Sequence, residues 1–142
     1  MSIAGMSATG YDMVGDIVAT HMDQYHLHTD GVALVMDMLS KHTTVAPVVD
    51  DDGRLAGFIG EVEILEALRN GKDIHHLQAE DLMKEPRIVA VTEMTSLSKV
   101  LQLFKEKHLH IIPVTREGRV IKSITRHDLI RALIGAGLGV EK

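Results

Sequence analysis

The chain contains no cysteine and no tryptophan, and only two phenylalanines and two tyrosines among its 142 residues. The absence of cysteine excludes disulfides and thiolate metal or redox sites, and it suits a reducing cytoplasm, where we expect the protein to be. Because aromatic rings are scarce, aliphatic side chains and the eight methionines must fill the core. A hydrophobic fraction of 45% with 25% charged residues is typical of a folded domain.

Long apolar runs and an excess of basic charge are also missing. No hydrophobic stretch approaches the roughly 20 residues that a membrane-spanning helix requires. The first ten residues lack the basic and apolar regions of a signal peptide. The net charge is -5, whereas nucleic-acid-binding domains are usually basic. We therefore expect neither a membrane nor a nucleic acid as partner.

The sequence contains one unit written twice. The stretch from His42 to Leu68 aligns with the stretch from His108 to Leu133, and Pro47 matches Pro113. A period of about 65 residues is too long for a solenoid, so it indicates a duplicated small domain. The expected layout is an N-terminal tail over 1–11, a first repeat over 12–71, a second repeat over 77–136 and a flexible C-terminus over 137–142.

Each copy predicts the order strand, helix, two strands, helix, which places the fold in the α/β (α+β) class. In the second copy the apolar residues 97, 100, 101 and 104 share one helix face, and Ser96 can cap that helix. Gly118 predicts a hairpin turn between β-rich runs over 111–115 and 119–124. A last helix is expected over 126–134, with Gly135 as its stop. In the first copy the turn over 50–53 contains three aspartates, which we interpret as a solvated hairpin and not as a metal site.

Two motifs carry a resemblance to a known family. Ile112-Pro113-Val114 opens the second strand, and Ile124-Thr125-Arg126-His127-Asp128-Leu129 opens the last helix. With the duplicated order of elements, the chain from about Met13 to Gly135 resembles the CBS domain family. The resemblance implies a stand-alone tandem CBS pair, or Bateman module, whose repeats pack as a pseudo-twofold pair and commonly form a homodimer. It also implies a regulatory protein that is not an enzyme.

The resemblance further implies an adenosyl ligand in a cleft between the repeats. Family members that bind adenosine carry Ser or Thr and Asp three residues apart, here Thr125 and Asp128. A carboxylate can accept hydrogen bonds from both ribose hydroxyls, and a helix N-terminus favours phosphate. The expected ligand is AMP, ADP, ATP or S-adenosylmethionine, and no cofactor is required. By analogy with the family, the other ligand-binding residues are Arg126, His127, His110, Ile111, Ile112, Pro113, Arg87 and Ile88.

The same four-residue motif has a purely structural interpretation. Ser/Thr-x-x-acid at a helix start is also a capping box, which would stabilise the helix by about 1 kcal/mol and bind nothing. The protein would then be a homodimerisation or protein-interaction module without a ligand. Under either interpretation, the protein that the module regulates is not identified by the sequence.

The first copy departs from the motif. Gly60 replaces the threonine and Glu63 the aspartate, and Glu61 would repel phosphate, so we expect at most one good nucleotide site. The degenerate second site comprises Gly60, Glu63, Thr44, Ala46 and Pro47. Lys122 occupies a position where the family usually has glycine, which either hinders the ligand or supplies a charge for phosphate.

Nine histidines also raise the hypothesis of a metal or polyamine sensor. The candidate pairs are His26 with His28, His75 with His76, and His108 with His110. The sequence places no third ligand beside any pair, so we expect no metal site. The match of His42 with His108 indicates a repeated packing role.

Overall fold

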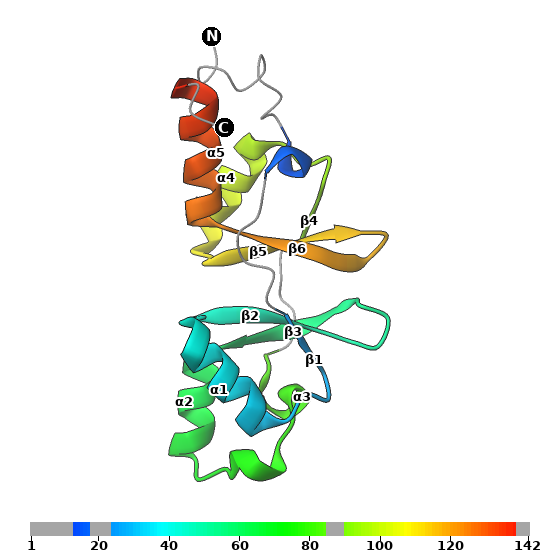
Figure 1. Ribbon diagram of the computed structural model, residues 1–142, viewed down its shortest axis with the longest axis vertical. Helices are drawn as coiled ribbons and strands as arrows, with labels where there is room; N and C mark the ends of the chain where they lie inside the picture. The colour runs from blue at the N-terminus through cyan, green and yellow to red at the C-terminus, as the bar shows by residue number, and fades with distance from the viewer. Residues whose placement is uncertain (1–12, 18–23, 85–89, 139–142) are drawn as a thin grey trace. The chain divides into compact units, whose positions relative to one another are not determined.

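The computed structural model describes residues 13–17, 24–84 and 90–138, which form two compact units (Figure 1). The first unit contains residues 24–84 and 118–120, and thus most of the first repeat. The second unit contains residues 13–17, 90–117 and 121–138, and thus most of the second repeat. Each repeat builds a three-stranded sheet with helices packed on it, so the predicted α/β class is confirmed.

The first unit follows the predicted order of elements. It consists of β1 (Tyr25–His26), α1 (Gly31–Lys41), β2 (Val45–Val49), β3 (Leu55–Gly60), α2 (Glu61–Arg69), the 3₁₀ helix η2 (Ile74–His76) and α3 (Ala79–Leu82). Strand β2 lies in the middle of the sheet, parallel to β1 and antiparallel to β3. In the β2–β3 turn, the Asp50 carboxylate accepts hydrogen bonds from the backbone N–H groups of Asp52 and Arg54. Gly53 supplies a φ of 82°, so this turn is the hairpin that the sequence predicts.

The second unit repeats the arrangement. It consists of η1 (Val14–Asp16), β4 (Val91–Thr92), α4 (Leu97–Lys107), β5 (Ile111–Arg116), β6 (Arg119–Thr125) and α5 (Arg126–Leu138). The sheet order is β4-β5-β6, with β4 parallel to β5. The predicted cap of α4 is present, because the Ser96 hydroxyl accepts a hydrogen bond from the N–H of Lys99 at 3.1 Å. Gly118 has a φ of 83° in the β5–β6 turn, as a tight hairpin requires.

The last helix is longer than predicted. It does not stop at Gly135 but continues through that residue to Leu138. A glycine inside a helix costs only about 1 kcal/mol relative to alanine, and that is too little to end a helix by itself. A glycine stops a helix when it adopts a left-handed conformation, and the local sequence does not determine whether it will.

The two matched histidines have a backbone role. His42 ends α1 and His108 ends α4, and both adopt left-handed conformations with φ of 55° and 51°. Both side chains are exposed, so the packing role expected from their alignment is wrong. A left-handed residue directs the chain out of the helix and towards the following strand.

Each hydrophobic core is completed by a segment that precedes the other repeat in the sequence. We call residues 13–17 and 79–84 the lead-in segments. Val14 and Ile17 are buried in the second unit beside the side chains of β5 and α4, with exposures of 0% and 3%. Ala79 and Leu82 are buried in the first unit in the same way. Each unit therefore combines one repeat with a segment that precedes the other repeat in the chain. The repeat boundaries 12–71 and 77–136 stay a prediction.

Among the helices that the structure describes, none combines the length and the apolar character that crossing a membrane would require.

Candidate functional site

The motif that the sequence singles out forms one tight turn at the junction of β6 and α5. The backbone N–H of Thr125 donates to Oδ2 of Asp128 at 3.0 Å. In return, the N–H of Asp128 donates to Oγ1 of Thr125 at 3.1 Å. These reciprocal bonds are those of a capping box, and they hold a hydroxyl and a carboxylate side by side in the first turn of the helix.

The carboxylate of Asp128 is buried, with an exposure of 1% for the residue. Its other oxygen, Oδ1, accepts a hydrogen bond from Nη2 of Arg131 at 2.6 Å. A buried charge is stable only when it is paired, and Arg131 supplies the pair from the next turn of α5. The sequence reasoning missed Arg131, although its spacing of three residues from an aspartate on a predicted helix was a usable signal.

The remaining residues expected at this site are spread over two elements. Arg126 and His127 are exposed in the first turn of α5, and His110 is exposed just before β5. Ile111, Ile112 and Pro113 are buried in β5, and Ile112 belongs to the core of the second unit. Arg87 and Ile88 lie outside the described residues.

The equivalent turn of the first unit has different chemistry. Gly60 is the N-cap of α2 and makes no side-chain hydrogen bond. Oε2 of Glu63 lies 3.3 Å from Nζ of Lys84, an ion pair that the sequence reasoning also missed. A side chain at position 60 would meet the Glu63 carboxylate, since a Cβ there would lie 2.8 Å from Oε1. Thr44 is exposed, whereas Ala46 and Pro47 are buried in β2.

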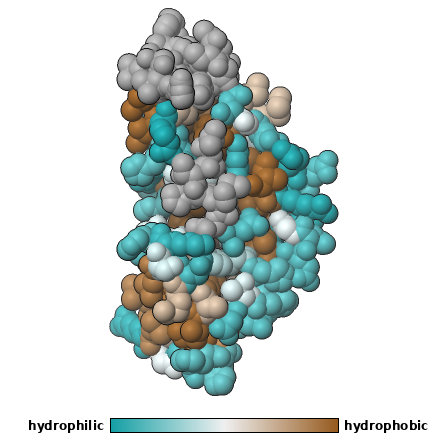
Figure 2. All heavy atoms as spheres, in the orientation of Figure 1, coloured by the Kyte–Doolittle hydropathy of each residue, from teal (hydrophilic) through white to brown (hydrophobic). Residues whose placement is uncertain are grey.

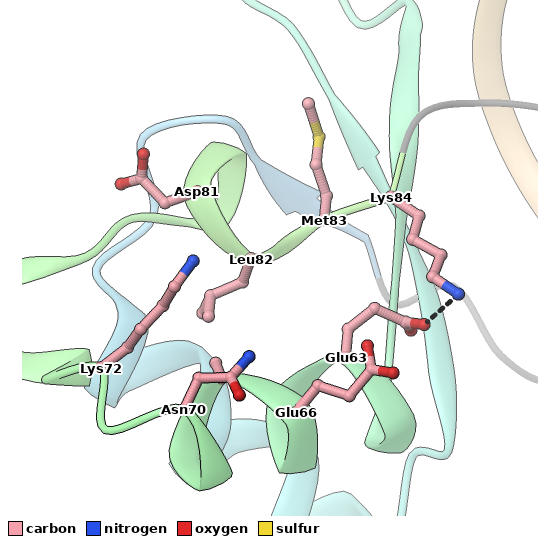
Figure 3. A pocket seen from close by; sticks show the side chains of 9 residues that line it. Glu63, Glu66, Asn70, Lys72, Asp81, Leu82, Met83 and Lys84 are labelled. Carbon is pink, nitrogen blue, oxygen red and sulfur yellow. Dashed lines mark ion pairs between the residues drawn. The ribbon is translucent and has the colours of Figure 1, made fainter.

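A small cavity of about 190 Å³ adjoins this turn (Figure 3). Glu63 and Lys84 lie together at one end of it, and Lys72 and Asn70 lie at the other. The cavity is lined by Glu63, Glu66, Ala67, Asn70, Lys72, Asp81, Leu82, Met83 and Lys84. Three carboxylates and two ammonium groups give a lining without a dominant charge, which does not favour a phosphate.

Basic side chains lie near the sheet of the second unit. Arg116 forms two hydrogen bonds with the carboxylate of Glu93, at 2.9 and 3.0 Å. This pairing lowers the pKa of Glu93 below its ordinary value, and the nearby charge of Lys122 lowers it further. Nζ of Lys122 donates to the backbone carbonyl of Ile17 at 2.7 Å.

The histidine pairs are tied to neighbouring polar groups. His26 pairs with Asp51, and Nδ1 of His28 lies 3.2 Å from Oε1 of Gln78 and 3.3 Å from Oε2 of Glu80. Over residues 13–17, 24–84 and 90–138, no three histidine, aspartate or glutamate side chains are grouped so that they could hold a metal ion.

Comparison with known proteins gives a match over most of the chain. The family model for the CBS domain matches twice, over residues 14–70 and 79–135. Among solved structures, the CBS-pair protein CBSX2 of Arabidopsis thaliana, crystallised in complex with AMP, superposes with a TM-score of 0.74 at 24% identity, covering 86% of this chain and 96% of that one. Hypoxic Response Protein I, solved with two coordinated zinc ions, gives a TM-score of 0.72 at 23% identity, covering 84% and 97%.

Two curated relatives match a part of their own length. The arabinose 5-phosphate isomerase KdsD of Pseudomonas aeruginosa is 24% identical over 115 residues, which are 81% of this chain and 35% of that protein. An uncharacterized protein of Methanocaldococcus jannaschii, MJ1225, is 26% identical over 95 residues, which are 67% of this chain and 33% of that protein. The chain thus spans about a third of the length of these relatives.

Proposed function

The chain belongs to the CBS domain family, and on that premise we propose that its second repeat binds an adenine nucleotide or another adenosyl compound. A pair of CBS repeats is a regulatory module, so the ligand would act as a signal and not as a substrate. The observation that carries the proposal is the turn in which Thr125 and Asp128 bond to each other at the start of α5. The first repeat has no such turn, because Gly60 lacks a hydroxyl.

The chemistry of this turn suits a ribose and a phosphate. The Asp128 carboxylate could accept hydrogen bonds from both hydroxyls of a ribose, and such charge-assisted hydrogen bonds are stronger than neutral ones. The N-terminus of α5 favours an anion, and the exposed Arg126 and His127 bring further donors to the same turn. AMP in the crystal structure of CBSX2, a protein of the same fold, supports this class of ligand.

Binding of a ribose to Asp128 would require a local rearrangement of side chains. Such a ligand-dependent rearrangement is what a sensor needs. Asp128 is covered, so a ribose reaches it only if a neighbouring side chain turns away. Arg131 is the neighbour able to do so, because its side chain is 55% exposed while it bonds to the carboxylate. A ligand that binds one arrangement of α5 more tightly than the other shifts the population between them, and a regulated protein can read that shift.

Thermal shift measurements test the proposal. AMP, ADP, ATP and S-adenosylmethionine are each titrated against the wild type, Asp128→Ala and Glu63→Ala. We expect at least one compound to raise the melting temperature of the wild type and of Glu63→Ala but not of Asp128→Ala. No shift of the wild type with any compound would refute the proposal, and a shift lost only in Glu63→Ala would move the site to the first repeat.

A second function, homodimerisation, is favoured by a separate observation. Large hydrophobic side chains are exposed on helices of each unit, and in the first unit Figure 2 shows them gathered over α1 and α2. They are Met36, Leu39, Val62, Leu65 and Leu68 in the first unit and Leu101, Ile130 and Ile134 in the second. Apolar patches of this kind, taken in each unit by itself, usually mark interaction surfaces. A second copy of the chain is the partner we propose, because a twofold dimer pairs the same patch on both subunits.

A further inference from the structure

The two repeats differ at one position of the strand that leads into the capping turn. Gly57 in β3 and Lys122 in β6 each lie three residues before the helix-capping residue, Gly60 or Thr125. At Gly57 the lead-in segment passes very close, and a Cβ would lie 2.4 Å from the carbonyl oxygen of Lys84. The lysine at the equivalent position of β6 therefore excludes an approach of this kind and places an ammonium group there instead.

The charge of Lys122 has no direct counter-charge among the described residues. Its one hydrogen bond in that part of the chain goes to the carbonyl of Ile17, which is a neutral acceptor. The nearby carboxylate, Glu93, is engaged by both hydrogen bonds from Arg116. Lys122 is half-buried, and a charge that is partly removed from water is stabilised by an anion. An ammonium group has three donors, so two remain after the bond to Ile17.

The surroundings of the capping turn add to this positive charge. The charge of Asp128 is balanced by that of Arg131 on the same helix, while Arg126 and His127 are exposed beside Asp128. The equivalent positions of the first repeat carry Glu61 and Val62 and thus no positive charge. An anion is therefore favoured in the second unit and disfavoured in the first.

We propose that Lys122 is a specificity-determining residue, which selects a phosphate-bearing adenosyl ligand over S-adenosylmethionine at the second repeat. This inference rests on the proposed function and names the class of ligand more narrowly. Lys122 lies three positions before Thr125 on β6, roughly 10 Å along the strand, a span that one nucleotide and a lysine side chain can bridge. S-adenosylmethionine carries a positive sulfonium, which the ammonium of Lys122 repels, whereas a negatively charged phosphate is attracted by that ammonium.

The test compares AMP, adenosine and S-adenosylmethionine by calorimetry on four proteins. They are the wild type, Lys122→Met, Lys122→Arg and the control Lys99→Met, which removes an exposed lysine of α4. Since a hydrogen bond to a charged group is worth about 1.5–3 kcal/mol, Lys122→Met should lower the affinity for AMP about tenfold or more. The affinity for adenosine should stay nearly unchanged. Lys122→Arg and Lys99→Met should keep the preference for AMP over adenosine. Circular dichroism melts show which variants are folded.

The outcomes separate the two proposals. If the wild type binds AMP and adenosine equally, or if Lys122→Met keeps the wild-type ratio, the role of Lys122 is refuted and the proposed function stands. A wild type that prefers S-adenosylmethionine refutes the role of Lys122 in the same way. If the wild type binds none of the three compounds, the proposed function is refuted, and the role of Lys122 with it. If Lys122→Met does not fold, loss of the preference in Lys122→Arg, which keeps the charge, refutes the role.

Discussion

At the ends of α1 and α4, His42 and His108 hold the left-handed conformation that L-residues avoid. In that conformation the Cβ lies close to the following carbonyl, which costs roughly 1–2 kcal/mol. The two repeats share this feature, and the alignment found the matched pair. Histidine as a residue type did not predict the left-handed conformation, since glycine and asparagine are the usual residues at a helix end of this kind.

Replacing His108 by glycine removes this strain. We expect His108→Gly to raise the free energy of unfolding by up to about 1 kcal/mol, because glycine adopts positive φ freely but loosens the unfolded chain. Urea denaturation measures the change. As a control, Lys105→Gly, three residues earlier and exposed inside the helix, should lower stability by about 1 kcal/mol. A loss of stability in His108→Gly would contradict the strain.

A buried tyrosine controls one carboxylate of the first unit. The hydroxyl of Tyr25 donates to Oδ2 of Asp37 at 2.7 Å and lowers its pKa, and Lys41 lies 3.2 Å from the same oxygen. A depressed folded pKa means that this stabilisation is present at neutral pH and is lost as the pH falls through that pKa. Tyr25→Phe should therefore raise the pKa of Asp37 in an NMR titration, and its stability deficit should shrink in acid. Asp73, whose pKa is lowered chiefly by the backbone N–H of His75, should titrate unchanged. An unchanged pKa of Asp37 in Tyr25→Phe would contradict the role that we assign to the tyrosine hydroxyl.

At the scale of elements, the strands and helices that depend on local chemistry were predictable. Apolar spacing predicted α4, and glycine-containing turns predicted both hairpins. The capping turn of Thr125 and Asp128 was also predictable, because both partners lie in four consecutive residues. The bond of Lys122 to Ile17 was not, since 105 residues separate the two and no local pattern encodes such a contact. The burial of the lead-in segments was missed for the same reason.

Substitutions at the equivalent positions Gly57 and Lys122 test how tightly the lead-in segments are held in the two units. In the first unit, Phe58 and Lys84 form two backbone hydrogen bonds at 3.1 and 2.8 Å, and Gly57 leaves the room for them. Gly57→Ala should therefore cost about 1–3 kcal/mol, as overpacking does. Lys122→Ala loses a side-chain hydrogen bond but also removes a half-buried charge, so it should cost no more than about 1 kcal/mol. Thermal denaturation of both variants checks the contrast. Equal losses would mean that the lead-in segments are held alike in both units.

At the scale of the whole molecule, the exposed apolar face of the helices predicts association. Leu65, 64% exposed on α2, lies in this face. Leu65→Glu places a charge in the proposed interface, so it should shift the protein from dimer to monomer in analytical ultracentrifugation. Met94→Glu makes the same kind of change at a residue that is 75% exposed outside the helices, and it should leave the dimer intact. A monomeric wild type, or a Leu65→Glu dimer as stable as the wild-type one, would contradict this assignment of the face.

We infer that the duplicated fold carries ligand chemistry in only one of its copies. Glu61 in the first repeat opposes an anion, whereas Lys122 and Arg126 in the second attract one. The number of ligands per chain follows from this asymmetry. The repeat could be predicted from the sequence, and so could the loss of the motif from its first copy.

The most direct measurement is isothermal titration of AMP into the purified full chain, with the stoichiometry as the readout. We predict one AMP per chain for the wild type, the same stoichiometry for Glu63→Ala, and no binding to Asp128→Ala. Two AMP molecules per chain, or binding that survives in Asp128→Ala, would contradict a single site at the second repeat.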